Sequence, residues 1–223
     1  CSRLWQTGAV GKRQEARNRI EAQIVQVGRR HLVTDGAAGL SLRWLRDNVF
    51  GWHYADAYDV MNVAAANTPP GAGGLLFLPY LVGERTPHMD PTARGAFFGL
   101  TLRHGQGELV RAVMEGVAFA CYDAYRVLAE LGVQSGSIIL AGGGARSPVW
   151  RQAVADIFQL PVQPLLTTAQ SALGAVLLAG GGAGLFDVAA TAAAWAQLGP
   201  ATTPDPQRAA LYAERYAAFH DLY

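Results

Sequence analysis

Three consecutive glycines after an apolar stretch are the residues of this chain best suited to bind a ligand. Residues 137–150 read SIILAGGGARSPVW, and the apolar part ends directly before Gly142, Gly143 and Gly144. Because glycine has no Cβ, a ring, a ribose or a phosphate can approach such a turn closely. Ser147 is suited to cap the helix that follows and Pro148 to its first turn, where unpaired N–H groups favour an anion. A tight corner between a strand and a helix would explain the same glycines.

Other motifs for phosphate binding or catalysis do not match. No Gly-Lys-Ser/Thr follows the glycines, which excludes a Walker loop. A dinucleotide fingerprint requires Gly or Ala where Ser147 stands, and the strand ending near Thr167 lacks the acidic residue that binds a ribose. The five histidines and two cysteines have no spacing typical of metal ligands, so we expect no metal site in the chain. No Gly-x-Ser-x-Gly elbow indicates a serine hydrolase.

Composition and charge indicate a folded protein without a nucleic-acid or membrane partner. The 223 residues include 18 Lys and Arg and 17 Asp and Glu, a net charge of +1. This balance argues against binding nucleic acid or anionic membranes through bulk charge. A hydrophobic fraction of 51% excludes intrinsic disorder. Two cysteines cannot form a disulfide framework, so we expect a cytoplasmic protein, and no apolar run reaches the ~20 residues of a membrane span.

The order of the predicted elements favours an α/β domain with a layered sheet. Hydrophobic periodicity, caps and breakers predict strands at 75–81, 96–102, 137–141 and 162–166, with a further short strand near residues 31–35. They predict helices at 41–51, 55–66, 107–131, 148–159, 170–180 and 208–222. The helix at 170–180 is apolar from Ala172 onwards, which predicts that it is buried. Residues 1–30 are polar and basic, and predict either one amphipathic helix or a poorly ordered leader or tail.

Three longer stretches match the pattern of a known family. They read GLSLRWLRD at 39–47, LPYLVGERTPHMDPTARGAFFGL at 78–100 and AGGGARSPVWRQAVADIFQLPV at 141–162. Together they resemble the C-terminal domain of the FGGY carbohydrate kinases, most closely the xylulokinase-like members. Residues 95–115 also resemble that family's second signature pattern in their spacing. The resemblance covers residues 36–180, about two thirds of the chain.

The resemblance implies an ATP-dependent sugar kinase of the actin-like ATPase superfamily. Two ribonuclease-H-like domains would close around ATP and sugar, and residues 31–223 would form the C-terminal, nucleotide-binding one. Gly144 and Pro148 match positions that contact adenosine, and Gly39 and Arg43 match a pair near the ribose or phosphates. Where Pro148 stands, glycerol kinases have Asn, so Ser147 or Arg146 would replace that side-chain hydrogen bond. The expected nucleotide-binding residues are Gly39, Arg43, Gly142, Gly143, Gly144, Ala145, Ser147 and Pro148.

Other parts of the family's pattern are missing from the chain. The catalytic Asp, the first phosphate loop and most sugar contacts belong to the family's N-terminal domain. Asp35 in TDGAAG aligns better with a variable turn, so we assign no catalytic residue. We expect ATP or ADP and Mg²⁺ as ligands, and a sugar held by the N-terminal domain. D-xylulose is the first choice of substrate, and glycerol, gluconate and ribulose remain open. A non-catalytic nucleotide-binding or assembly module is the alternative.

Three further expectations concern packing and surfaces. Glu84 and Arg85 lie in a long polar loop, which would either face the cleft between the domains or form a surface ion pair. The aromatic residues Trp44, Trp150 and Phe158 have helical spacing and are expected in the core. A cleft face without its partner domain would expose apolar surface, which favours self-association, including a homodimer.

Overall fold

The computed structural model describes residues 39–167 and 170–223. The predictions for residues 1–30 and for a strand near 31–35 lie outside this range. Residues 39–44 are α-helical and continue into a π-helix. The further elements are η1 (Leu45–Phe50), α2 (Ala57–Ala66), η2 (Ala72–Gly74), β1 (Leu76–Leu78), β2 (Ala96–Phe98), α3 (Gln106–Glu130), β3 (Ile138–Leu140), η3 (Gly143–Arg146), α4 (Pro148–Phe158), β4 (Val162–Pro164), α5 (Gln170–Gly182), α6 (Val188–Trp195), η4 (Pro206–Arg208) and α7 (Ala209–Asp221).

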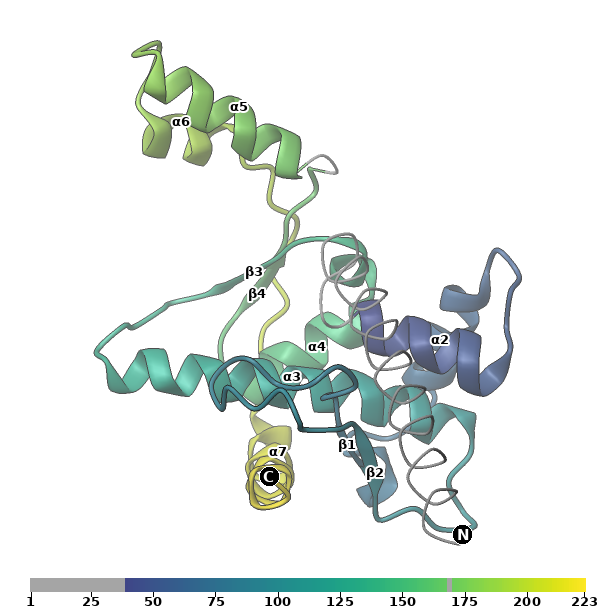
Figure 1. Ribbon diagram of the computed structural model, residues 1–223. Helices are drawn as coiled ribbons and strands as arrows, with labels where there is room; N and C mark the ends of the chain where they lie inside the picture. Colours follow the sequence, from purple (N-terminus) through teal and green to yellow (C-terminus); the bar gives the residue numbers. More distant parts are fainter. Residues whose placement is uncertain (1–38, 168–169) are drawn as a thin grey trace, which may run out of the picture.

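Helix α3 is the central element of the molecule (Figure 1). It packs against β1 of the antiparallel pair β1–β2 and against helices α2, α4 and α7. The second pair, β3–β4, is parallel, with Ile138 opposite Val162, and the helix α4 connects its two strands. The strand, helix and strand that the sequence predicts here therefore form a βαβ unit with parallel strands. It places the start of α4 directly after the three glycines.

The sequence of α3 explains its position. Glu108 accepts a hydrogen bond from the N–H of Gly105 at 2.9 Å, which caps the first turn. Ten consecutive residues from Val110 to Phe119 are buried, and Gly116 lets the helix approach β1, because a Cβ there would collide with the carbonyl of Phe77. The buried residues of α3 lie almost entirely in this half. Leu128 is 48% exposed, since the C-terminal half runs beyond the elements that cover the rest.

A buried ion pair joins α3 to α7 and to the end of α2. Arg111 Nε donates to Glu115 Oε1 at 2.8 Å, and Arg111 also donates to the carbonyls of Ala65 and Thr68 at 3.0 and 2.9 Å. Glu115 Oε1 further accepts from the hydroxyl of Tyr212 at 2.8 Å. Burial raises the pKa of Glu115, and the guanidinium beside it opposes that shift. The guanidinium, the carboxylate and the hydroxyl of this buried cluster therefore all have hydrogen-bond partners within the protein.

Three buried tyrosines, Tyr80, Tyr212 and Tyr216, are expected to make the protein sensitive to alkaline pH. Burial raises the pKa of all three phenols above the ordinary value of 10, that of Tyr216 to about 12. Above pH 10 the unfolded chain loses these protons first, so the folded state binds more protons. The stability contribution is therefore complete below pH 10 and lost as the pH rises towards 12.

Denaturant unfolding at stepped pH, with tyrosinate absorbance recorded in the folded protein, measures this loss. Tyr216→Phe removes one of the three phenols and is expected to flatten the decline. If all the tyrosines of the folded protein ionised together near pH 10, the expected burial effect would be absent.

The structure corrects two predictions about packing and extent. The helix near 170–180 exists as α5, but the prediction that it is buried is wrong: Leu178 is 71% exposed. It packs on α6, which the sequence reading missed, with the rings of Phe186 and Trp195 5.6 Å apart. This helical hairpin projects from the rest of the molecule (Figure 1). The predicted strand at 96–102 ends at Phe98, and Leu102 is fully exposed.

The aromatic prediction is confirmed, because Trp150 is buried and Trp44 and Phe158 pack against the core. No helix in the described part of the chain is both long and apolar enough to cross a membrane.

Candidate functional site

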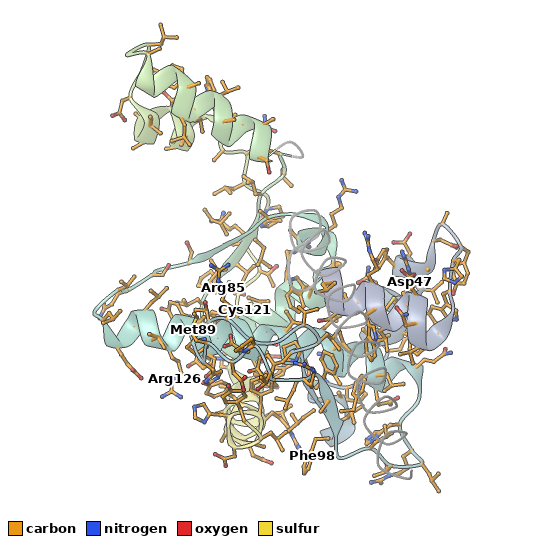
Figure 2. The ribbon with its side chains drawn as sticks, in the orientation of Figure 1. Asp47, Arg85, Met89, Phe98, Cys121 and Arg126 are labelled. Atoms are coloured by element: carbon orange, nitrogen blue, oxygen red, sulfur yellow. The ribbon has the colours of Figure 1, made fainter. Side chains whose placement is uncertain are left out.

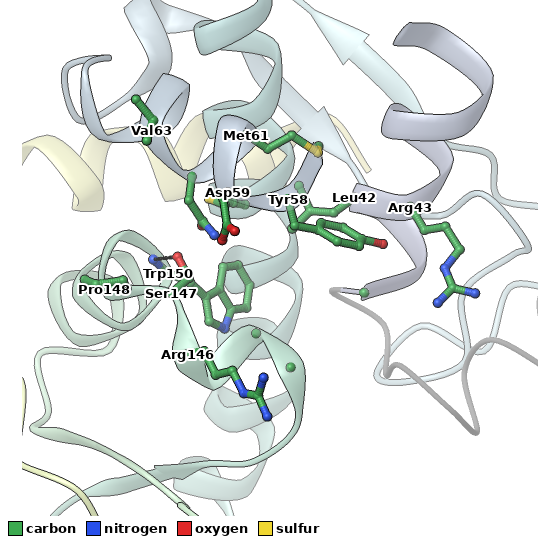
Figure 3. Close-up of a pocket in the computed structure, with 15 residues that line it drawn as sticks. Leu42, Arg43, Tyr58, Asp59, Met61, Val63, Arg146, Ser147, Pro148 and Trp150 are labelled. Carbon is green, nitrogen blue, oxygen red and sulfur yellow. Dashed lines mark hydrogen bonds between the residues drawn. The ribbon is translucent and has the colours of Figure 1, made fainter. Parts of the chain in front are cut away.

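A cavity of about 560 Å³ opens where the helix at residues 39–44, helix α2 and the corner between β3 and α4 meet (Figure 3). This volume is in the range of typical small-molecule sites, ~300–1,000 Å³. The residues that line it are Gly39, Leu42, Arg43, Tyr58, Asp59, Met61, Asn62, Val63, Met114, Gly143, Gly144, Arg146, Ser147, Pro148 and Trp150.

The glycine turn is open towards this cavity. Gly142 has a left-handed φ of 85°, which directs the chain from β3 into the short helix η3. A Cβ at Gly143 would meet nothing within 4 Å, and one at Gly144 would touch only the ring of Trp150, at 3.6 Å. The backbone over these two residues is therefore accessible to a ligand and not covered by protein atoms.

The start of α4 has the cap that the sequence predicts. Ser147 is the N-cap, and its hydroxyl accepts a hydrogen bond from the N–H of Trp150 at 3.1 Å. Pro148 occupies the first helical position. The positive end of the α4 dipole thus lies at the wall of the cavity.

Ser147→Ala is expected to lower the free energy of unfolding by about 1 kcal/mol, because the N–H of Trp150 loses its acceptor. Urea denaturation followed by circular dichroism measures the change. Ser147→Asp supplies another good cap and serves as the matched control, which should unfold close to the unmodified protein. Equal stability of the Ala variant and the unmodified protein would contradict the capping role.

Most of the residues predicted for this site meet at the cavity. Gly39, Arg43, Gly143, Gly144, Ser147 and Pro148 all line it, together with Arg146. Two predicted residues, Gly142 and Ala145, are not among the lining residues. Gly142 shapes the turn, and Ala145 is buried beneath it.

One wall of the cavity is formed by α2, which the sequence did not predict to belong to the site. Tyr58, Asp59, Met61, Asn62 and Val63 come from this helix, about 80 positions before the glycines. The only local signal was that the polar residues Asp59 and Asn62 are three positions apart, which places them on one helix face. These two residues line the same cavity as the glycine turn because α2 packs beside α3 and α4.

The loop with Glu84 and Arg85 lies away from the cavity. Glu84 accepts hydrogen bonds from the backbone N–H groups of Thr86, His88 and Met89, the last two at 2.8 and 3.0 Å. The carboxylate therefore organises its own loop, and the alternative of an ion pair with Arg85 is not found among the described residues. Figure 2 shows Arg85 and Met89 on the other side of the molecule from Asp47. That this loop faces a domain cleft stays a prediction.

His88 anchors the same loop to the body of the protein. Its Nε2 lies 3.0 Å from the carboxylate of Asp123 on α3, and its ring stacks on Tyr223 with centroids 3.8 Å apart. The other oxygen of Asp123 accepts from the hydroxyl of Tyr216 on α7. The loop thus has a defined shape, held by α3 and by the end of the chain.

A family comparison decides what the chain is related to. The model of the FGGY family of carbohydrate kinases, C-terminal domain, matches residues 32–183. The chain belongs to the FGGY family. The predicted α/β, actin-like ATPase fold class is thereby confirmed, since solved FGGY structures superpose on this chain.

Individual relatives of this FGGY domain are kinases of several sugars. A xylulose kinase of Staphylococcus epidermidis is 36% identical over 188 residues, which are 84% of this chain and 37% of that protein. A gluconokinase of Bacillus licheniformis is 41% identical over 148 residues, 63% of this chain and 29% of that protein. The crystal structure of xylulose kinase from Rhodospirillum rubrum matches with a TM-score of 0.73 and 36% identity, over 83% of this chain and 37% of that one. The matched part of the FGGY domain described here therefore covers only 29–37% of the length of these relatives.

Proposed function

We propose that this FGGY domain binds the nucleotide of an ATP-dependent sugar kinase. The observation that carries the proposal is the accessible backbone of Gly143 and Gly144 at the wall of a 560 Å³ cavity. Trp150, Met61 and Met114 supply an apolar surface for a base, while the N-terminus of α4 and Arg43 favour phosphates. An apolar slot, bare main chain and cations at one site are the features that a nucleoside triphosphate requires.

The reaction of the whole protein follows from this assignment as a proposal. It would transfer the γ-phosphoryl group of ATP to a hydroxyl of a ketopentose, with D-xylulose as the first candidate, because xylulose kinases are among the relatives. Phosphoryl transfer depends on positioning and charge stabilisation, and a general base typically contributes about 10²–10⁴-fold. We assign no base within this chain, so we expect the chain alone to be nearly inactive.

Mg²⁺ is the usual companion of ATP in such reactions, and the described residues supply at most part of its ligands. They contain no group of three His, Cys, Asp or Glu side chains that could hold a metal ion. Mg²⁺ is commonly bound by substrate phosphates with one or two carboxylates. We therefore expect Mg²⁺ to arrive with the nucleotide and assign none of these residues as its ligand.

Titration calorimetry with ATP and ADP tests the nucleotide assignment. We expect both to bind this chain with Kd below about 1 mM, which corresponds to about −4 kcal/mol. D-xylulose alone should give no heat, because the resemblance places the sugar contacts in the other domain. Failure of both nucleotides to bind at millimolar concentration would contradict the assignment.

Gluconate is the second candidate substrate, favoured by the gluconokinase relative with 41% identity. Phosphoryl transfer by the whole protein to D-xylulose, gluconate, ribulose and glycerol separates the candidates. Transfer to one sugar with a kcat/KM well above the others identifies it. Nucleotide binding without transfer to any of the four would favour a non-catalytic binding or assembly module. The cytoplasmic location, a homodimer and the domain boundary at residue 31 stay predictions.

A further inference from the structure

Very little packing holds the glycine turn in place. Gly142, Gly143 and Gly144 are exposed, and a Cβ at the first two would meet nothing within 4 Å. Glycine also loses more conformational freedom on folding than any other residue. The shape of the turn therefore depends on its hydrogen bonds and on Ala145, which is buried beneath it.

The hydrogen bonds within the turn close only its own backbone. The N–H of Ala145 donates to the carbonyl of Gly142 at 3.2 Å. The N–H of Ser147 donates to the carbonyl of Gly144 at 3.0 Å. Each of these bonds spans three residues, so they wind the segment into the short helix η3. They leave the attachment of η3 to the body of the protein to other groups.

The side chain of Arg151 supplies such an attachment from helix α4. Its Nη1 donates to the carbonyl of Ala145 at 2.7 Å and to that of Arg146 at 3.2 Å. These are the last two residues of η3, and the carbonyls at the end of a helical turn carry partial negative charge that favours a cation. The two bonds therefore join the far end of the glycine turn to α4.

Helix α4 is itself anchored in the core. The N–H of Arg151 donates to the carbonyl of Ser147 at 3.0 Å, so the residue belongs to the first hydrogen-bonded turn of α4. Its neighbours Trp150, Val154 and Ala155 are part of the hydrophobic core. Arg151 is not among the residues that line the cavity, so any effect that it has on a ligand there is transmitted through the glycine turn.

We propose that Arg151 is a positioning residue, which holds the glycine turn in the conformation that receives the nucleotide. The inference rests on the proposed function, since the ligand is the nucleotide assigned above. A turn that already has its binding conformation lowers the entropy lost on binding. Where only a fraction of the molecules have that conformation, the apparent Kd is the intrinsic Kd divided by that fraction. Arg151 contributes to affinity in this way without touching the ligand.

Arg151→Met removes the donor and keeps the aliphatic stem, and is expected to raise the Kd for ADP about tenfold in calorimetry. Without ligand, amide hydrogen exchange of residues 143–147 should be faster than in the unmodified chain, while that of α3 should stay unchanged. A residue that only supports the fold would accelerate exchange in α3 as well. A residue that binds phosphate directly would weaken ADP binding without changing exchange in the ligand-free turn. Either of these results would overturn the inference.

Arg151→Lys is the conservative variant. Both hydrogen bonds of the Arg151 side chain come from one nitrogen, so an ammonium group with its three donors can make them. We expect this variant to recover most of the lost affinity and the slower exchange of the turn. A lysine variant that binds ADP as weakly as Arg151→Met would contradict the role of the two bonds.

Arg94→Met is the matched control. Arg94 Nη1 also donates to two backbone carbonyls, those of Pro91 and Ala93, at 3.1 and 2.8 Å, but none of these three residues lines the cavity. This variant should bind ADP as the unmodified chain does. If Arg151→Met also bound ADP as the unmodified chain does, this inference alone would be overturned. If the unmodified chain bound neither ATP nor ADP, the proposed function would fail as well.

Discussion

Arg111→Met is expected to lower the free energy of unfolding by about 3–5 kcal/mol, because it leaves the carboxylate of Glu115 buried without its cation. The carbonyls of Ala65 and Thr68 lose their donor in the same variant. Guanidinium chloride denaturation at neutral pH measures the loss. The deficit should shrink as the pH falls towards 4.5, since the pKa of Glu115 rises further without Arg111 and the carboxyl takes up a proton.

Two further variants show whether the loss comes from the unpaired charge. Arg126→Met removes a guanidinium that is 47% exposed and should cost less than about 1 kcal/mol. The double variant Arg111→Met with Glu115→Leu removes both charges and should be more stable than Arg111→Met alone, because a buried apolar pair needs no counterion. If Arg111→Met were as stable as the unmodified protein, the buried ion pair would contribute nothing to the free energy of unfolding.

Gly143→Val is expected to weaken nucleotide binding by about 10–100-fold, with little change in stability. The φ of Gly143 is not left-handed and a Cβ there meets nothing within 4 Å, so the fold accommodates a side chain. The added methyl groups would instead occupy the space over the accessible backbone, where we expect the nucleotide to lie. Overpacking that costs about 1–3 kcal/mol of binding free energy corresponds to the stated loss of affinity. Calorimetry with ADP and thermal unfolding of the same sample measure both quantities.

Gly136→Val is the matched control for this variant. Gly136 also lacks a left-handed φ and has open space at its Cβ, but it precedes β3 and is not among the residues that line the cavity. The control should bind ADP as the unmodified chain does. Gly144→Val should resemble Gly143→Val, with an additional contact to Trp150. Undiminished binding in both glycine variants would show that nucleotides do not approach this turn.

The site could be predicted where it depends on local chemistry. The glycines, the cap at Ser147 and the proline at the first helical position are neighbours in sequence, and their conformations follow from their own residue types. Gly39 and Arg43 came from the family resemblance, and both line the cavity. The wall that α2 contributes could not be found in this way, because nothing in residues 57–66 indicates which segment will face them.

The helix α5 shows the same limit for burial. Its apolar composition on all sides is typical of a buried helix. Burial, however, is a relation between two surfaces, and among the described residues α5 packs on α6 and leaves Val176 and Leu178 exposed. The composition predicted the helix correctly and its surroundings incorrectly.

The sequence by itself determined the helices and strands other than α6, the open turn with its capped helix, and membership of the FGGY family. These properties depend on backbone preferences and on residues close together in the chain, which a linear pattern records. Only the tertiary structure decided that Asp59 and Asn62 face the glycine turn, that Arg111 and Glu115 share a buried pocket with Tyr212, and that Glu84 bonds to its own loop. Each of these depends on which surfaces meet when distant segments pack, and that choice is made by the free energy of the whole fold.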